Sequence, residues 1–240
     1  MNAAPPESQP AQVPPQVPPQ VPPMRAAIIP VTPLQQNCTL IWCTRTNAAA
    51  LIDPGGDLDR IQAAVAQAGV QLVKILITHG HIDHCGEAGT LAKILGVPIE
   101  GPQEADRFWI SRLAEDGRNY GIAGAVFEPD RWLEHGDTVT LGDLTLDVIH
   151  CPGHTPGHVV FYHAPSRFAV VGDVLFEGSI GRTDFPMGDH AALIASITQR
   201  LWPLGNDVLF VPGHGRTSSF GAERMHNGFV ADAVLAAAKK

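Results

Sequence analysis

The sequence predicts an α/β protein in which two β-sheets pack face to face and helices cover their outer faces. Short apolar strands outnumber the helical segments, and the two do not alternate strictly, as they would in a fold built from βαβ units. The 240 residues, 45% of them hydrophobic and 17% charged, are enough for one large domain with a substantial core.

The first 23 residues differ from the rest in composition. The unit QVPP occurs three times over residues 12–23. Because proline fixes φ and lacks an amide donor, we expect residues 1–23 to form a disordered, proline-rich extension and the folded domain to occupy residues 24–240. Recognition of this extension by a proline-binding partner is the alternative.

The first half of the domain begins with strands over residues 38–44 (CTLIWCT) and 48–53 (AAALID). The turn PGG ends the second strand, and Asp57 is expected to cap a helix over residues 58–68 that Gly69 terminates. These elements predict one sheet with a helix on its outer face.

A buried strand over residues 72–79 (LVKILITH) and a helix over about residues 87–95 complete this half. Helical patterns recur over residues 103–114 and 189–201. Five further strands are expected at residues 138–142, 144–150, 159–163, 168–176 and 207–214.

The net charge is -8, which repels phosphate backbones and argues against nucleic acid as a partner. No apolar run approaches the roughly 18 residues of a membrane helix, so no membrane partner is expected either. The N-terminus lacks the pattern of a secretory signal, and the cysteines form no CxxC pair, so we expect a cytoplasmic protein that acts on a small molecule. The four cysteines, expected to be reduced, are Cys38, Cys43, Cys85 and Cys151.

The stretch THGHIDH at residues 78–84 contains four metal-ligand side chains within six positions, those of His79, His81, Asp83 and His84. Imidazole and carboxylate are usual ligands of divalent transition metals, and four such groups exceed one open site. This cluster follows a buried strand directly, which places it on a loop at a sheet edge.

Three other strands also end in ligand-type residues, His154, Asp173 and His214. We expect His79, His81 and His154 to hold one ion, with Asp83, His84 and His214 holding a second and Asp173 bridging the two. Two divalent ions roughly 3.5 to 4 Å apart would activate a shared water for hydrolysis.

Other polar residues have simpler interpretations. Cys85 is expected to be a small buried hydrophobe. Asp53 either hydrogen-bonds the metal-binding loop or belongs to a plain turn. The remaining histidines are interpreted as ordinary surface or core residues: His135, His150, His158, His163, His190 and His226.

Four motifs, THGHIDH, CPGHTPGH, VVGDVLF and VPGHG, resemble those of the metallo-β-lactamase superfamily. The resemblance covers roughly residues 24–230 and implies a four-layer αββα sandwich with the site at one edge of the sheets. It implies two metal ions, typically zinc, with iron or manganese as substitutes. Within the superfamily, GSIGRTDFPMGD (residues 178–189) and the segment 213–229 are similar to short, single-domain hydrolases of the glyoxalase II type.

This resemblance implies hydrolysis of an S-2-hydroxyacylglutathione thioester, such as S-lactoylglutathione, by a hydroxide that bridges the metals and that Asp83 orients. Arg182 matches a basic residue that meets the glutathione carboxylate, unless it forms a buried structural pair with Asp184. The sequence departs from glyoxalase II at Asp184, where an aromatic residue is expected, and at Arg216, where a tyrosine is. Only 26 residues follow His214, so the helical domain that helps to bind glutathione is not expected.

Other functions remain open at this stage. A mononuclear iron persulfide dioxygenase of the same superfamily would use the equivalents of His79, His154 and Asp173, but the turn VPGHG favours a hydrolase. A lactonase or another ester hydrolase is possible, as is a non-catalytic, metal-stabilised interaction protein. The oligomeric state is not predicted.

Overall fold

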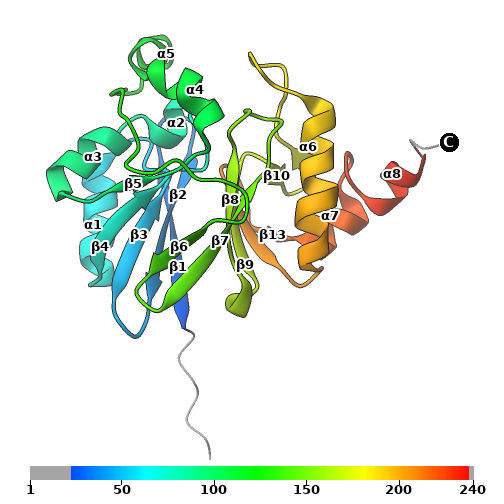
Figure 1. Cartoon of the computed structure of the whole chain (residues 1–240), viewed down its shortest axis with the longest axis horizontal. Helices are drawn as coiled ribbons and strands as arrows, with labels where there is room; N and C mark the ends of the chain where they lie inside the picture. Colours follow the sequence, from blue (N-terminus) through cyan, green and yellow to red (C-terminus); the bar gives the residue numbers. More distant parts are fainter. Residues whose placement is uncertain (1–22, 238–240) are drawn as a thin grey trace, which may run out of the picture.

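The computed structural model describes residues 23–237, so the proline-rich extension expected over residues 1–23 lies almost wholly outside the described residues. Two sheets pack face to face with helices on both outer faces, as predicted (Figure 1). One sheet has the order β1-β2-β3-β4-β5 and the other the order β13-β12-β9-β8-β7-β6. The strands of the first sheet are β1 (Met24–Val31), β2 (Gln36–Cys43), β3 (Ala48–Ile52), β4 (Gln71–Leu76) and β5 (Ile99–Glu100). Those of the second sheet, in chain order, are β6 (Thr138–Leu141), β7 (Leu144–His150), β8 (Val159–His163), β9 (Phe168–Gly172), β12 (Leu209–Pro212) and β13 (Ser218–Ser219). A separate hairpin pairs β10 (Leu175–Phe176) with β11 (Ser179–Ile180).

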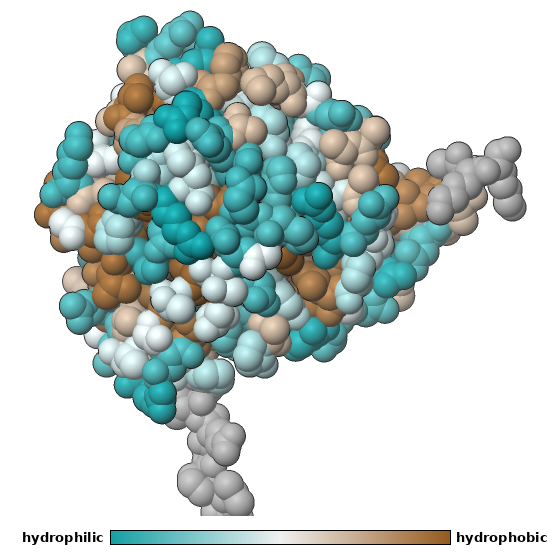
Figure 2. Space-filling model, in the orientation of Figure 1, coloured by the Kyte–Doolittle hydropathy of each residue, from teal (hydrophilic) through white to brown (hydrophobic). Residues whose placement is uncertain are grey.

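Strand alternation divides the interior into three hydrophobic cores. On β3, Ala50 and Ile52 face the second sheet, whereas Ala49 and Leu51 face the helices. On β8 of the second sheet, Val159 and Phe161 likewise face the first sheet, whereas Val160 and Tyr162 face the helices. Successive side chains of a strand point to opposite faces, so each strand contributes to two cores. Three cores separate four layers, which confirms the predicted αββα architecture. With the apolar side chains buried there, Figure 2 shows mostly hydrophilic residues on this face of the molecule and hydrophobic ones in small groups.

The helices that cover the sheets follow the predicted apolar periodicity. Helices α1 (Leu58–Ala68) and α3 (Ala88–Leu95) pack on the first sheet and end at Gly69 and Gly96, both in the left-handed conformation. On the second sheet lie α6 (His190–Ser196), a π-helical continuation (Ile197–Leu201) and α7 (Phe220–His226). The remaining helical segments are α2 (Ile82–Cys85), α4 (Arg107–Ser111), α5 (Leu113–Tyr120), α8 (Asp232–Ala237) and the 3-10 turns η1 (Glu104–Asp106), η2 (Ala164–Ser166) and η4 (Trp202–Leu204).

Three local predictions need correction. Asp57 precedes α1 but makes no capping hydrogen bond, because its carboxylate accepts from the Thr32 amide at 2.9 Å. The helix expected over residues 103–114 is broken into η1, α4 and α5, and α5 continues to Tyr120 through polar residues that carry no apolar period. The edge strand β1 was not predicted, since Pro30 interrupts its pattern.

Strand direction brings distant parts of the sequence to one edge. Strands β7, β9 and β12 run parallel to one another, because β8 pairs antiparallel with both β7 and β9 and β12 pairs parallel with β9. Their carboxyl ends therefore share one edge of the second sheet. Asn37 of β2 joins the first sheet to this edge: its Nδ2 donates to the carbonyls of Pro212 and Gly215, both at 3.0 Å.

Among residues 23–237, no helix combines the length and apolar character that would let it cross a bilayer.

We predict that Asn37→Ala lowers the free energy of unfolding by about 1 to 3 kcal/mol, because the buried Pro212 carbonyl and the Gly215 carbonyl lose their shared donor. The measurement is urea denaturation of the wild type and the variant. Gln62→Ala, on the exposed face of α1, is the control and should change the free energy of unfolding by less than about 0.5 kcal/mol. Equal denaturation midpoints for Asn37→Ala and Gln62→Ala would contradict this.

Candidate metal centre

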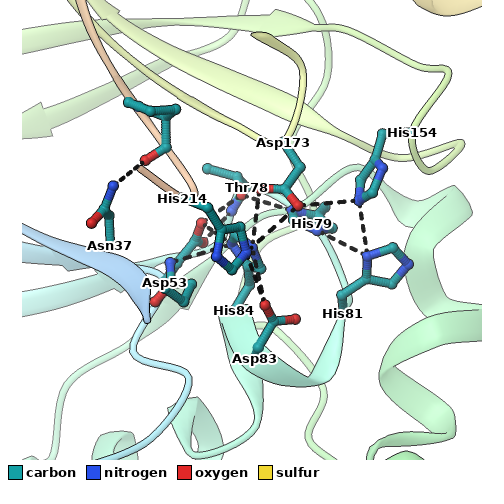
Figure 3. A network of polar contacts seen from close by, with 12 residues as sticks. Asn37, Asp53, Thr78, His79, His81, Asp83, His84, His154, Asp173 and His214 are labelled. Carbon is teal, nitrogen blue, oxygen red and sulfur yellow. Dashed lines mark hydrogen bonds and ion pairs between the residues drawn. The ribbon is translucent and has the colours of Figure 1, made fainter. Parts of the chain in front are cut away.

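The seven side chains predicted as metal ligands converge at the shared edge of the two sheets (Figure 3). The loop after β4 carries His79 and His81, and the short helix α2 that follows carries Asp83 and His84. The loops after β7, β9 and β12 carry one each. Three groups of three residues have ligand atoms within 4.8 Å of one another. One of them, Asp53, His79 and His84, is already joined by a 2.8 Å contact between His84 Nδ1 and Asp53 Oδ2, so we take the other two as the candidate metal sites. These two groups are His79, His81 and His154, and Asp83, His84 and His214.

In the first group three imidazole nitrogens face a common point. His79 Nε2 lies 3.1 Å from His81 Nδ1, and His154 Nε2 lies 3.0 Å from the same atom. His81 has an extended backbone and immediately precedes α2. All three rings are buried or half-buried.

In the second group His214 Nε2 lies 3.0 Å from Asp83 Oδ2, and His84 Nε2 lies 3.8 Å from that oxygen. Asp173 stands between the groups. Its Oδ1 is 3.3 Å from His84 Nε2, and its Oδ2 is 3.5 Å from His154 Nε2. A carboxylate in this place can ligate ions in both groups.

The outward nitrogens of four histidines face oxygen atoms. His84 Nδ1 lies 2.8 Å from Asp53 Oδ2, and His154 Nδ1 lies 2.8 Å from the Arg182 carbonyl. His214 Nδ1 lies 3.2 Å from the Leu34 carbonyl. His79 Nδ1 faces the Thr78 hydroxyl at 3.0 Å. With the protons on these outward nitrogens, each Nε2 would present a lone pair to a cation bound at the centre.

These lone pairs and two carboxylates would repel one another without a positive charge between them. Despite burial, which opposes a charged imidazole, Asp173 and Asp83 raise the pKa of His84 well above its usual value. The surrounding histidines hold the pKa of Asp173 far below its usual range against the effect of its own burial. His84 Nε2 and Asp173 Oδ1 are buried and make no normal hydrogen bond within residues 23–237. This donor set fits divalent cations.

Asp53 is a hydrogen-bonding partner of the metal-binding loop, which is one of its two predicted roles. Besides His84, its carboxylate accepts from the Thr78 amide at 2.7 Å and the Thr78 hydroxyl at 2.6 Å. The end of β3 is thereby joined to the end of β4. Cys85 is buried and free, as expected.

Sequence reasoning missed Asp106, a buried carboxylate in η1. One oxygen accepts from the Gly157 amide at 2.6 Å, and the other accepts from the Gly80 amide and the Thr155 hydroxyl, both at 2.8 Å. Burial raises the pKa of Asp106 to about 6. Asp106 thus fixes the backbone beside His154 and between His79 and His81, and no local sequence signal marks it.

His158 also has a closer relation to the site than predicted. It belongs to neither ligand group, but its ring stacks on His79 at a centroid distance of 4.6 Å. Its Nε2 accepts the Asp173 amide hydrogen at 3.1 Å. His158 therefore positions two residues of the site, and its place in the motif CPGHTPGH was the available signal.

A cavity of about 910 Å³ opens beside the two groups. Arg182, predicted to bind substrate, lines it and stacks on Phe185 at 4.2 Å. Both oxygens of Asp184 accept from Arg182 at 2.7 Å, but the two side chains are 61% and 68% exposed, so the alternative of a buried pair is wrong. An aromatic residue was expected at position 184, and Phe185 supplies an aromatic ring at the next position.

Residues 31–214 match the family model described as the metallo-beta-lactamase superfamily. The chain belongs to this superfamily. The family that the motifs predict, and with it a metallohydrolase, is thus confirmed. Members of the superfamily bind metal ions, typically two, and the two ligand groups of this chain accord with that number.

Several proteins are similar to this chain over most of its length. The hydroxyacylglutathione hydrolase GloC of Haemophilus influenzae is 43% identical over 209 residues, which are 86% of this chain and 98% of that protein. The crystal structure of TTHA1623 in a di-iron-bound form has a TM-score of 0.77 at 34% identity and covers 85% of this chain and 99% of its own. The crystal structure of the BLEG-1 B3 metallo-beta-lactamase has a TM-score of 0.79 at 32% identity and covers 86% of this chain and 99% of its own.

We predict that Asp106→Asn weakens metal binding by about 10- to 100-fold, because an amide cannot accept from all three donors that the carboxylate serves. Titration of zinc against a chelator of known affinity measures the change. Asp59→Asn, exposed on α1, is the control and should bind as the wild type does. Equal affinities for the two variants would show that Asp106 does not support the site.

We predict that Gly213→Ala also weakens zinc binding by at least about tenfold. A Cβ at this position would lie 2.0 Å from Asp173 Oδ1 and 2.6 Å from His84 Cε1, so both side chains must move. Gly228→Ala is the matched control, since a Cβ there meets nothing within 4 Å. Metal content by elemental analysis distinguishes them, and a fully loaded Gly213→Ala protein would contradict the prediction.

Proposed function

We propose that the chain holds two divalent metal ions, most simply zinc, and hydrolyses a glutathione thioester of a 2-hydroxy acid, such as S-lactoylglutathione. The observation that carries this is the convergence of two three-residue ligand groups on the Asp173 carboxylate. His79, His81 and His154 are the proposed ligands of one ion, and Asp83, His84 and His214 those of the other. Residues 24–240 would form the hydrolase domain, with residues 1–23 as an extension.

The proposed substrate class draws support from the relative named hydroxyacylglutathione hydrolase, whose whole length this chain nearly covers. The cavity supports it as well, because its volume of about 910 Å³ suits a ligand of tripeptide size. Arg182 lines this cavity and provides a cation for a substrate carboxylate.

Two bound divalent cations supply a water of lowered pKa and polarise the thioester carbonyl. Asp83 lines the cavity with a side chain that is 11% exposed, and we assign to its carboxylate the orientation of the attacking water through a hydrogen bond. The leaving thiolate needs no strong acid, since the pKa of a thiol is about 8.5. The role of the protein is thus to hold donors, align the water and enclose the ester.

The second ligand group is what favours this function over a mononuclear iron dioxygenase. Such an enzyme would leave Asp83, His84 and His214 without a purpose, although these three lie together and the buried His84 Nε2 faces the carboxylates of Asp83 and Asp173. A structural zinc site, which four ligands close, would not gather seven. We retain a lactonase or another ester hydrolase as the second candidate, because an open cavity adjoins the ligands.

We propose the cytoplasm as its location and small molecules as its partners. In support, the four cysteines are all free, as expected of a reducing compartment.

We predict about two zinc ions per wild-type chain purified without chelators, and turnover of S-lactoylglutathione by the same sample. His79→Ala and Asp173→Ala should lose metal and nearly all activity, because each removes a donor from a converging group. Elemental analysis and thiol release measure the two properties.

His190→Ala is the control for these variants, since His190 is exposed at the start of α6 and belongs to neither group. It should keep both metal and activity. A fully active Asp173→Ala protein would count against the two-metal assignment, whereas one iron per chain with oxygen uptake would indicate a dioxygenase.

A further inference from the structure

One wall of the cavity is a helical segment formed by α4 and α5. Trp109, Arg112, Asp116 and Tyr120 line the cavity at spacings of three or four residues, which places them on one helical face. Trp109 meets His81 edge-on with ring centroids 4.5 Å apart. This face therefore begins at the ligand groups and extends away from them along the cavity.

Two residues of this face are charged, although a face that packs on an apolar core would be hydrophobic. The Asp116 side chain is only 13% exposed, and its carboxylate lies 3.3 Å from Arg112 Nη2. Arg112 Nε is buried and makes no hydrogen bond with the described residues. Arg112 therefore keeps a donor unused next to an anion that is largely withdrawn from solvent.

The charges of the cavity wall match those of one substrate class. Apart from the proposed metal ligands, the charged residues among those that line the cavity are Arg112, Asp116 and Arg182, two cations and one anion. A glutathione thioester carries two carboxylates and one ammonium group. Each substrate charge thus has one counterpart of opposite sign on the wall.

The two arginines are not equivalent. Arg182 is also paired, with Asp184, but Asp184 does not line the cavity. Arg112 and Asp116 offer a cation and an anion side by side. An α-amino acid group, in which carboxylate and ammonium share one carbon, presents a complementary pair.

We propose that Arg112 and Asp116 bind the carboxylate and the ammonium of the γ-glutamyl end of the thioester, which leaves Arg182 for the glycine carboxylate. This subsite rests on the proposed function and deepens it. It gives α4 and α5 the task of selecting thioesters with a free amino-acid end. An ordinary i,i+4 ion pair on a helix surface would influence stability slightly and selectivity not at all.

The test compares S-lactoylglutathione with two other thioesters in the zinc-loaded full chain. S-lactoyl-N-acetylcysteamine lacks both ends of the peptide, and S-lactoyl-N-acetylglutathione lacks only the ammonium charge. Arg112→Gln and Asp116→Asn should each raise KM for S-lactoylglutathione about tenfold and leave kcat/KM for the cysteamine ester unchanged. Asp116→Asn should also abolish the preference for the free over the acetylated amine.

A binding measurement without chemistry accompanies the kinetics. S-hexylglutathione contains no thioester, and calorimetry should show its Kd rising about tenfold in both variants. Glu115→Gln is the matched control: Glu115 also pairs with Arg112, at 3.5 Å, but does not line the cavity. Arg118→Gln, exposed on the same helix, controls for loss of a positive charge.

Thermal denaturation confirms that each variant is folded, and the conservative Asp116→Asn keeps the test informative if Arg112→Gln unfolds. An unchanged ratio between the glutathione and cysteamine esters in Asp116→Asn, with turnover intact, would overturn the subsite and leave the hydrolase. Turnover of no thioester by the zinc-loaded wild type would overturn the proposed function together with the subsite.

Discussion

The buried Asp53 carboxylate is the contact on which the site depends. It holds the Thr78 amide and hydroxyl at the end of β4 and faces the outward nitrogen of His84. Because Thr78 donates its hydroxyl hydrogen to Asp53, its oxygen is left to accept from His79 Nδ1. A single side chain immediately after β3 therefore constrains two histidines that belong to different ligand groups, His84 directly and His79 through Thr78. Its replacement would release both rings and the loop between them.

The same arrangement explains why the cluster is incomplete without cations. The outward nitrogens are fixed by oxygen partners, so the inward atoms are lone pairs and carboxylate oxygens that converge at 3.0 to 3.8 Å. Without metal, protons must provide the missing positive charge, which is why the pKa of His84 and that of His214 are raised by the neighbouring carboxylates in spite of burial. A metal ion that binds here would therefore displace these protons, so the affinity for metal would rise with pH.

The ligands and the cavity wall come from different parts of the fold. Strand-end loops and the short helix α2 supply the proposed ligands, whereas α4 and α5, at one end of the sandwich in Figure 1, supply charged residues that line the cavity. Because the wall contributes no metal ligand, its residues can change without disturbing the reacting centre. This separation lets one superfamily act on different substrates with the same ligand arrangement.

The sequence by itself determined the sandwich and the identity of the seven converging side chains. Hydrophobic alternation with period two fixes which face of each strand is buried, and His-x-His-x-Asp-His is too dense a cluster for an ordinary loop. Only the tertiary structure showed the contacts of Asp106 and His158 and the place of Arg112 and Asp116 on the cavity wall. Asp106 bonds to residues 26 and 51 positions away, and Arg112 and Asp116 form what looks in sequence like a solvated helical pair. The physical reason is that local patterns record burial and backbone preference, whereas a hydrogen-bond partner or a cavity wall depends on which distant segments pack together.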